Sequence, residues 1–501
     1  MKTIEFDHVI MGAGIVGVWL ARRLLSMGRS VALVDIGAAD ADELRMPSPA
    51  VHFAERENLG VTKARNHVFT GNSKYWGGGL IRNDADSLCK MFNLPSSSSI
   101  LDEIVECYQF VEKQLEIPTK VCASVEGNVR VSEISVLPGK YRDIANKLLE
   151  PFLDGQKLKL FCNADIIKLN FGVSNRIESV TLLLPDQSQI VLVAKHFVLS
   201  MGVVDSNIFT LKNLLPNLKQ TGPLVGKKLN DHWSIPIAKI EWKNNAGLDW
   251  LYPPKFRGDF IQGVHAEINS VCPWGLQAGF LHLQADYDQV EPYATIKNFL
   301  NGRQQRKRFG AQLRSLLPVL WHIGKLSSLG YNRYVRKKLF VPDGMELNLV
   351  MDFESFPSEQ NKFIVDNGVT KLYWDVREED VLAFSSLLTR SNGSIRQWAK
   401  DSGMQVKLLM EDGCAGQLAE YLRKHVIDAY HLGGGLAVGS TPEVSVLNQD
   451  FRFHEIDNLA AIGTATFSKA GVANPVETLL ALCERYSRTI VKYEKDKNAW
   501  K

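Results

Sequence analysis

The alternation of apolar and polar residues near the N-terminus predicts a strand, a helix and a second strand in close succession. Residues 9–11 form a short apolar run, which is typical of a buried parallel strand. From Ile15 to Met27 apolar residues recur at helical spacing, two arginines lie on the other face, and Gly28 follows as a C-cap. Residues 30–34 predict the second strand, which leads to Asp35. This order indicates the start of a dinucleotide-binding α/β unit.

The turn between the first strand and the helix has the glycine spacing of a dinucleotide fingerprint. Gly12 permits the tight turn, Gly14 lets the backbone approach a pyrophosphate, and Gly17 lets the helix pack close to the sheet. An acid at position 35 accepts a hydrogen bond from a ribose 2′-hydroxyl and disfavours a 2′-phosphate. The predicted dinucleotide contacts are Gly12, Gly14, Ile15, Val16, Gly17 and Asp35. A glycine-rich turn in an ordinary α/β domain is the alternative interpretation.

A second nucleotide-type stretch lies near the C-terminus. Residues 458–467 read NLAAIGTATF, and residues 471–475 read GVANP. A nicotinamide-binding unit is completed within one local fold, whereas a flavoprotein often returns its chain to the same nucleotide at the far end. The pairing therefore favours FAD as the cofactor, and a nicotinamide dehydrogenase would leave the C-terminal motifs unexplained.

The pattern along the chain predicts the fold class α/β, α+β overall, with a discontinuous domain. Residues 1–95, 155–235 and 426–501 are expected to form an FAD-binding Rossmann-like domain, with a helical insertion at 96–154. Residues 236–425 predict a substrate-binding domain built on a mixed or antiparallel sheet with helices. The individual elements expected are helices at 100–115 and 476–493 and strands at 158–161, 180–184, 190–193 and 197–199.

Composition narrows the class of protein. A chain of 501 residues with 45% hydrophobic and 23% charged residues is typical of an ordinary soluble protein of two domains. The net charge of +3 gives no indication of nucleic-acid binding. None of the seven cysteines forms a CxxC pair, so we expect no metal site, and their scatter favours a reducing compartment. With no recognisable signal peptide or transmembrane run, a cytoplasmic location is expected.

Four further motifs lie at separated points of the chain. They are TGNSKYWGGG at 70–79, VLSMGVVDS at 198–206, GKKLNDH at 226–232, and the C-terminal pair YHLGG at 430–434 with GVANPVET at 471–478. Together with the fingerprint they resemble the glucose–methanol–choline (GMC) family of FAD-dependent oxidoreductases, and among them the sugar-dehydrogenase branch. The resemblance implies a flavin domain, a separate substrate domain and oxidation of an alcohol.

The motif at 70–79 resembles the family's flavin-facing loop, where small residues let the backbone lie against the isoalloxazine ring. The resemblance implies flavin contacts by Asn72, Ser73, Trp76, Gly77 and Gly78. The chain departs from the pattern by having Thr70 for a glycine and Asn72 for Ser or Thr. Some relatives carry a histidine, bonded covalently to the flavin, at the position that Tyr75 occupies here. We therefore expect FAD to be bound non-covalently.

The other motifs imply more of the cofactor site. Further contacts are expected from Gly202, Gly463, Thr464, Asn474 and Pro475. Pro475 suits the first turn of the final helix, whose N-terminus favours the negative charge of a reduced flavin. Asp231 and His232 are expected to be mainly architectural. Two further departures are Asn207, where Pro is common, and Gly435, where Thr is common.

The resemblance also assigns the catalytic pair. His431 is expected to take the hydroxyl proton while hydride passes from carbon to flavin N5, because an imidazole has a suitable pKa for a general base. Asn474 would hydrogen-bond the substrate oxygen. A buried structural histidine is the alternative for His431 taken alone.

The expected substrate is a small alcohol of carbohydrate type; the electron acceptor is not indicated. A segment at 303–338 contains ten Lys or Arg and no Asp or Glu, interleaved with apolar residues. It predicts contact with an anionic membrane surface or an anionic substrate, or else a solvated basic face over a packed apolar one. Competing functions are an FAD-dependent lyase or isomerase, and a redox-inactive FAD-containing scaffold in a biosynthetic complex.

Overall fold

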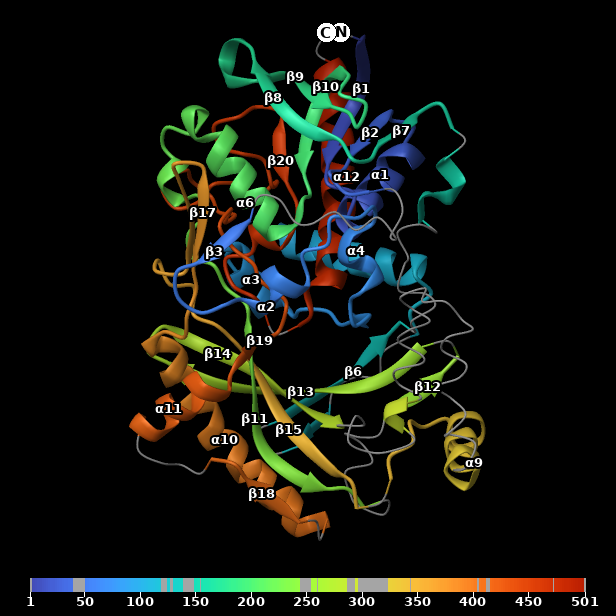
Figure 1. The fold of residues 1–501 in the computed structure, drawn as a ribbon, viewed down its shortest axis with the longest axis vertical. Helices are drawn as coiled ribbons and strands as arrows, with labels where there is room; N and C mark the ends of the chain where they lie inside the picture. Colours follow the sequence, from blue (N-terminus) through green and yellow to red (C-terminus); the bar gives the residue numbers. More distant parts are fainter. Residues whose placement is uncertain are drawn as a thin grey trace.

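The chain builds two large sheets in opposite halves of the molecule, as the computed structural model shows (Figure 1). The structure describes residues 2–38, 50–118, 124–126, 129–137, 148–153, 155–243, 254–258, 260–285, 293–295, 323–342, 344–402, 405–410, 415–471 and 473–499. Residues 303–322 of the basic segment lie outside the described residues. Among the described helices, none is long and apolar enough to cross a membrane.

The first sheet is mixed, with a parallel centre that carries the fingerprint. Its order is β7 (Leu158–Phe161), β2 (Val31–Val34), β1 (Lys2–Met11), β10 (Gln189–Leu199), β9 (Ile177–Leu183) and β8 (Asp165–Phe171), and β20 (Leu459–Ala461) pairs with β10. β1 pairs in parallel with β2 and β10, and β20 joins β10 in parallel, so the C-terminal motif returns to the N-terminal sheet. The strands expected at 190–193 and 197–199 are one strand, because β10 continues through the polar Lys195 and His196 and pairs with β1 on both sides of Lys195.

Three helices cover the first sheet. They are α1 (Ile15–Ser26), α4 (Ser99–Gln114) and α12 (Pro475–Ala499). Their apolar faces join the sheet in one core, in which Leu20 of α1, Ile104 of α4 and Leu480 of α12 are fully buried. The three helices expected at 15–27, 100–115 and 476–493 are therefore present, each within a few residues of its predicted bounds except for the longer α12.

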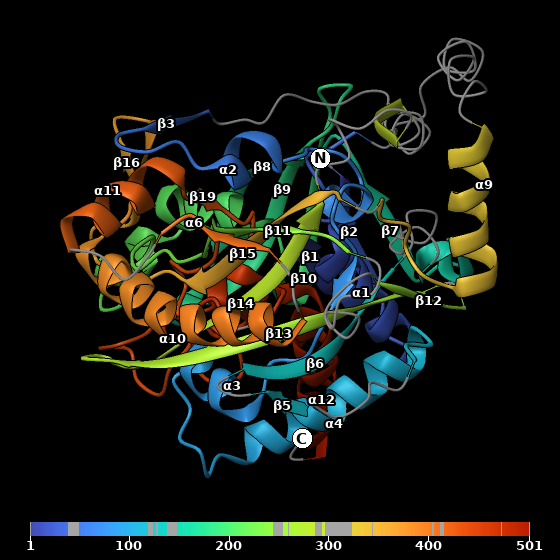
Figure 2. The same ribbon diagram turned by 90° about the horizontal axis from the view of Figure 1, so that it is seen from below.

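The second sheet is antiparallel and occupies the other half (Figures 1 and 2). Its order is β18 (Val406–Leu408), β11 (His232–Glu241), β15 (Glu346–Glu354), β14 (Gly275–Ala285), β13 (Phe260–Cys272), β6 (Val129–Val136) and β4 (Gly79–Leu80); β5 (Ser124–Glu126), β12 (Lys255–Arg257) and β19 (Ile427–Asp428) pair at its edges. Helices α10 (Glu378–Ser402) and α11 (Ala415–His425) cover its apolar face, with Phe384 and Leu422 fully buried.

The strand pairing differs from the helical insertion expected at 96–154. Only the first part of that region is helical, since β6 pairs with β13 as a full member of the second sheet. Val129 and Val131 of β6 are buried and alternate with polar neighbours, the two-residue period of a strand. β4, which belongs to the region expected within the FAD domain, pairs with β6.

Several short elements lie between the two sheets and around them, and those used below are named here with the smaller sheet. They are the three-stranded sheet of β16 (Lys362–Asp366), β17 (Val369–Tyr373) and β3 (Val51–Phe53), the helices α2 (Leu59–Lys63), α3 (Ala85–Phe92), α6 (Gly202–Asn213) and α9 (Ile323–Tyr331), the 3₁₀ turns η2 (Gly71–Lys74) and η11 (Thr464–Thr466), and the π-helical turn η10 (Asn332–Arg336).

Candidate active site

One cavity of about 840 Å³ joins the N-terminal and C-terminal motifs, a volume in the range of sites that hold small molecules and cofactors. The predicted site residues that line it are Gly12, Gly14, Ile15, Val16, Asp35, Asn72, Ser73, Trp76, Gly77, Gly78, Gly202, His431, Gly463, Thr464, Asn474 and Pro475. Gly17 does not line it. A Cβ at Gly17 would lie 1.9 Å from the carbonyl oxygen of Gly12, so Gly17 permits helix packing, the role expected of it.

The N-terminus of α1 faces the cavity without a capping side chain. Gly14 is the N-cap, no side chain bonds to the first turn, and Ile15 and Val16 line the cavity. A Cβ at Gly14 would meet no protein atom within 4 Å, so the backbone is open to a close-lying ligand. Free N–H groups and the helix dipole make such a terminus suitable for a pyrophosphate.

Asp35 lies beside this terminus. Its carboxylate accepts hydrogen bonds from the backbone N–H of Ala13, at 2.5 Å, and of Gly37, at 2.6 Å. Burial nevertheless raises the pKa of Asp35 above its usual value. A hydroxyl donor such as a ribose would stabilise the carboxylate, because a hydrogen bond to a charged group favours the charged form.

The loop at 70–79 is held by its own polar side chains. The amide oxygen of Asn72 accepts a hydrogen bond from the Asn66 side chain at 2.8 Å, and its amide nitrogen donates to the Ala64 carbonyl. The hydroxyl of Ser73 donates to the Thr70 carbonyl at 2.6 Å. Thr70 itself has φ +72°, a left-handed conformation that glycine adopts more readily, which explains why the related pattern has glycine there.

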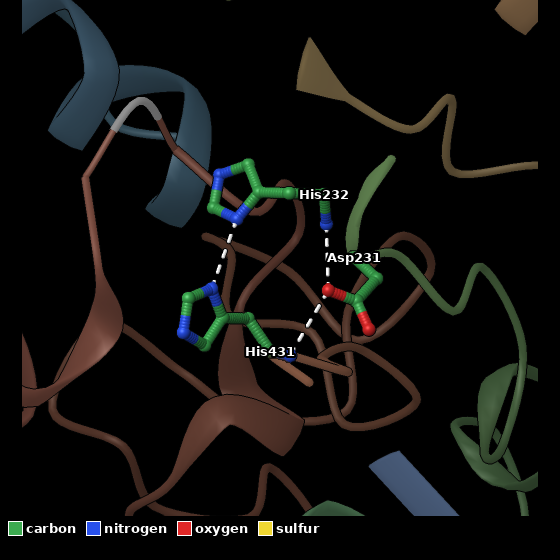
Figure 3. Close-up of side chains that lie close together, drawn as sticks. All are labelled: Asp231, His232 and His431. Carbon is green, nitrogen blue, oxygen red and sulfur yellow. Dashed lines mark hydrogen bonds between the residues drawn. The ribbon is translucent and has the colours of Figure 1, made fainter. Parts of the chain in front are cut away.

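His431 and His232 form a pair whose tautomers the structure determines (Figure 3). Nε2 of His232 lies 2.6 Å from the carbonyl oxygen of Gly471, so this nitrogen carries a proton and donates it to the carbonyl. In the neutral ring Nδ1 of His232 is then an acceptor, and Nδ1 of His431, 3.3 Å away, must donate to it. The neutral His431 is left with its lone pair on Nε2.

The environment keeps His431 neutral. Burial, followed by the neighbouring His232, lowers the pKa of His431 to about 3, although the negative charge of Asp352 acts in the opposite direction. The ring is therefore unprotonated at neutral pH with a lone pair on Nε2, and the lowered pKa also makes it a weaker base than a free imidazole.

Asp231 fixes the backbone of both histidines (Figure 3). One carboxylate oxygen accepts the N–H of His232 at 2.7 Å and the N–H of His431 at 3.0 Å. Burial and the nearby Asp428 raise the pKa of Asp231 well above its usual value. Ligand atoms of Asp231, His232 and His431 lie within 4.8 Å of one another, but the complementary tautomers already explain the imidazole contact. Asp231 thus has a positioning role.

Asn474 is the last residue before α12, and its neighbours are held firmly. The N–H of Gly471 donates to Glu354 of β15 at 2.9 Å, while the Gly471 carbonyl accepts from His232. Asn83 accepts from the N–H of Ala473 at 3.2 Å and donates to Thr478 at 3.0 Å. The segment that contains Asn474 is thereby tied to the same sheet and histidine that orient His431.

Sequence reasoning missed a polar face on the second sheet, next to the histidine pair. Nε2 of His282 on β14 lies 3.4 Å from the Asp352 carboxylate on β15. Burial acts to lower the pKa of His282, but the negative charge of Asp352 raises it above its usual value. Burial acts to raise the pKa of Asp352, but the charge of His282 and its hydrogen bond lower it below its usual value. The signal was in β15 alone, where Asn348, Asp352 and Glu354 alternate with an apolar face; β14 has no such alternation.

A charged cluster at the cavity wall was also missed. Arg65 and His67 both bond Asp205 in the first turn of α6, the latter at 3.2 Å. Burial would raise the pKa of Asp205, but the hydrogen bonds from His67 and Arg65 lower it below its usual value. Lys63 and Lys212 also line the cavity. Asp205 lies within the motif at 198–206, but the other side chains lie just outside the motifs, where no spacing marked them.

Two departures from the family pattern are neighbours in space. The Asn207 amide donates to the carbonyls of Val203, at 2.8 Å, and of Gly434, at 3.0 Å. A Cβ at Gly435 would lie 2.0 Å from the Asn207 amide oxygen, and Gly435 has φ +92°. Asn207 therefore occupies the space that a side chain at 435 would need.

The cavity fits FAD in its donors and its open backbone. The N-terminal ends of α1, α6 and α12 all contribute lining residues, and helix N-termini favour anionic groups. At Gly14, Gly77, Gly202 and Gly463, a Cβ would meet no protein atom within 4 Å. Side-chain-free backbone of this kind lets a planar ring or a pyrophosphate lie directly against the chain.

Comparisons with known proteins agree with this arrangement. Residues 372–483 match the family model described as GMC oxidoreductase. No curated protein matches the chain.

Solved structures with this fold cover nearly all of the chain. Pyridoxine 4-oxidase from Mesorbium loti has a TM-score of 0.57 at 13% identity and covers 96% of this chain and 98% of its own. Formate oxidase has a TM-score of 0.57 at 13% identity, with 99% and 100% covered. A formate oxidase variant from Aspergillus oryzae has a TM-score of 0.58 at 13% identity, with 98% and 99% covered. The C-terminal part of the chain thus matches the GMC oxidoreductase family model, and the chain as a whole shares the fold of these oxidases; both findings support the resemblance to GMC oxidoreductases.

Proposed function

We propose that the protein oxidises a CH–OH group of a carbohydrate-type alcohol, with His431 as the general base and FAD held non-covalently. The observation that supports this most directly is the neutral His431, whose Nε2 is left unprotonated by the hydrogen bond at Nδ1. His431 and Asn474 line the same cavity as the fingerprint glycines, as a shared alcohol and flavin site requires.

The chain's own groups have separate tasks in this reaction. Nε2 of His431 takes the hydroxyl proton, and the Asn474 amide donates a hydrogen bond to the substrate oxygen. His232, anchored by the Gly471 carbonyl, keeps the Nδ1 proton of His431 in place, so that Nε2 remains the basic atom. Bound FAD supplies the hydride acceptor at N5, and the carbon that loses hydride becomes a carbonyl carbon.

The FAD is proposed to be held by the residues that line its cavity. The N-terminus of α1 would face the pyrophosphate, and Asp35 would accept a hydrogen bond from the adenosine ribose. The loop at 70–79 and the α12 N-terminus, with Gly463 and Thr464, would lie against the flavin. Tyr75 also lines the cavity, and a phenol at this position lacks the imidazole nitrogen to which covalent attachment is expected in relatives.

The polar face of the second sheet supports a polyhydroxylated substrate. The His282–Asp352 pair lies close to His431, whose pKa the charge of Asp352 influences, but neither side chain is among the residues that line the cavity. Sugar hydroxyls need both donors and acceptors, and substrate binding would have to bring them within reach of this pair. An ion pair of zero net charge gives no preference for an anionic substrate.

The test is an anaerobic absorbance titration of the purified protein against a panel of sugars, sugar lactones and glycosides. Bleaching of an oxidised-flavin spectrum by one of them is the expected result, and readmitted air then distinguishes an oxidase from a dehydrogenase. His431→Asn should keep the flavin spectrum and reduce the bleaching rate about 10²- to 10⁴-fold. A flavin that no member bleaches would refute the carbohydrate proposal, and unchanged bleaching by the variant would remove His431 from the mechanism.

A further inference from the structure

The end of α9 and the π-helical turn η10 expose apolar and aromatic side chains within five residues of one another. Tyr331 is 56% exposed, Tyr334 73% and Val335 63%. Single exposed apolar residues are common on soluble proteins, but a contiguous group of them marks an interaction surface.

The same turn is strongly basic. Arg336 and Lys337 are exposed, and neither forms an ion pair with any residue that the structure describes. The guanidinium of Arg333 lies 3.6 Å from the ring centroid of Phe256 on β12, a strand that also carries Lys255 and Arg257. Residues 323–342 and 254–258 contain no Asp or Glu.

This surface is attached to the second sheet. The N–H of Phe256 donates to the Lys337 carbonyl at 2.6 Å, and the N–H of Leu339 donates to the Pro254 carbonyl at 2.8 Å. β12 in turn pairs with β13. Both views place α9 at the periphery of the molecule, beyond β12 (Figures 1 and 2). The turn is thus held by the substrate-domain sheet and presented outward.

We propose that Tyr331, Arg333, Tyr334, Val335, Arg336 and Lys337, termed the basic aromatic patch, dock the protein on an anionic phospholipid surface. Tyrosine suits the boundary between headgroups and acyl chains, because its ring is apolar and its hydroxyl remains hydrated. Unpaired Arg and Lys side chains are attracted to anionic headgroups. A nucleic acid would satisfy the cations and stack a base on Tyr334 but would leave Val335 without an apolar partner, and an acidic protein surface without apolar side chains would leave both without one. This inference is independent of the proposed substrate.

The experiment is co-sedimentation of the full-length holoprotein with vesicles of phosphatidylcholine alone or with about one third phosphatidylserine, at low and at physiological salt. Binding to the anionic vesicles, weakened by salt, is expected. Arg336→Gln with Lys337→Gln should lower the partition coefficient about 30-fold, since each cation contributes about fivefold. Tyr334→Ser with Val335→Ser should lower it about tenfold or more, through lost apolar insertion.

The control is Val271→Ser, which removes another apolar side chain, 74% exposed, at the β13–β14 turn. It should bind vesicles like the parent, and flavin content and circular dichroism should show that every variant is folded. No sedimentation with anionic vesicles at low salt overturns the proposal, as does binding that survives both double substitutions. Retention on heparin without binding to vesicles would also overturn it and would assign the patch to an acidic macromolecule.

Discussion

Substituting Gly17 and Gly14 by alanine separates helix packing from cofactor binding in the fingerprint. A Cβ at Gly17 would lie 1.9 Å from the Gly12 carbonyl oxygen and 2.8 Å from the Ser200 hydroxyl, so α1 must move by about 1 Å. Overpacking against backbone costs about 3 kcal/mol, and the better helix propensity of alanine offsets about 1 kcal/mol of it. We therefore expect Gly17→Ala to lower the free energy of unfolding by about 2 kcal/mol.

Gly14→Ala should have the opposite effects: stability should change little, and FAD affinity should fall. Its Cβ would meet no protein atom, and the loss of a favourable N-cap residue costs less than about 1 kcal/mol. The same methyl projects into the cavity, so we expect FAD affinity to fall at least about tenfold. The assay compares thermal unfolding without added FAD and with saturating FAD, together with FAD titration followed by flavin fluorescence. If Gly17→Ala is as stable as the parent, or Gly14→Ala binds FAD equally well, the assignment of packing to one glycine and ligand approach to the other is refuted.

Further predictions concern the histidine pair, the flavin loop and the coupled departures. The rate of flavin reduction should stay level from pH 8 down to about 5, because the pKa of His431 is lowered to about 3 and the ring is protonated only at lower pH. An apparent pKa near 6.5 in the pH–rate profile would contradict this. His232→Phe should slow flavin reduction and alter its pH profile while leaving FAD affinity unchanged, whereas a purely structural role would leave the profile as it was. Thr70→Gly should be more stable than Thr70→Ala by about 1 kcal/mol in thermal unfolding, since φ is +72°; the usual order, alanine above glycine, would contradict the strain. Gly435→Ala should lower the free energy of unfolding by about 2 kcal/mol or more, and adding Asn207→Ala to that variant should recover part of the loss. If the two substitutions change the free energy of unfolding additively in a double-mutant cycle, the contact is disproved.

The local sequence was sufficient to predict the secondary structure of those segments whose structure depends on their own residues. The β1–turn–α1 unit follows from a buried apolar run, three glycines and helical periodicity, and the structure has it at the expected residues. β10 was expected as two strands, because Lys195 and His196 interrupt the apolar pattern; pairing with β1 on both sides of Lys195 keeps them in one strand. β6 was assigned to a helical insertion, although its two-residue alternation was visible, because its partner β13 is distant in the chain.

The candidate site shows the same division. Motif spacing, together with the family resemblance that the motifs carry, named residues from the two ends of the chain that meet in one cavity. Tertiary structure alone decided that Nδ1 of His431 donates to His232 and that Asn207 fills the space beside Gly435. It alone placed the His282–Asp352 pair near the base. A hydrogen bond, a close contact or a pKa depends on atoms brought together from distant segments, and one sequence specifies the segments without specifying those distances.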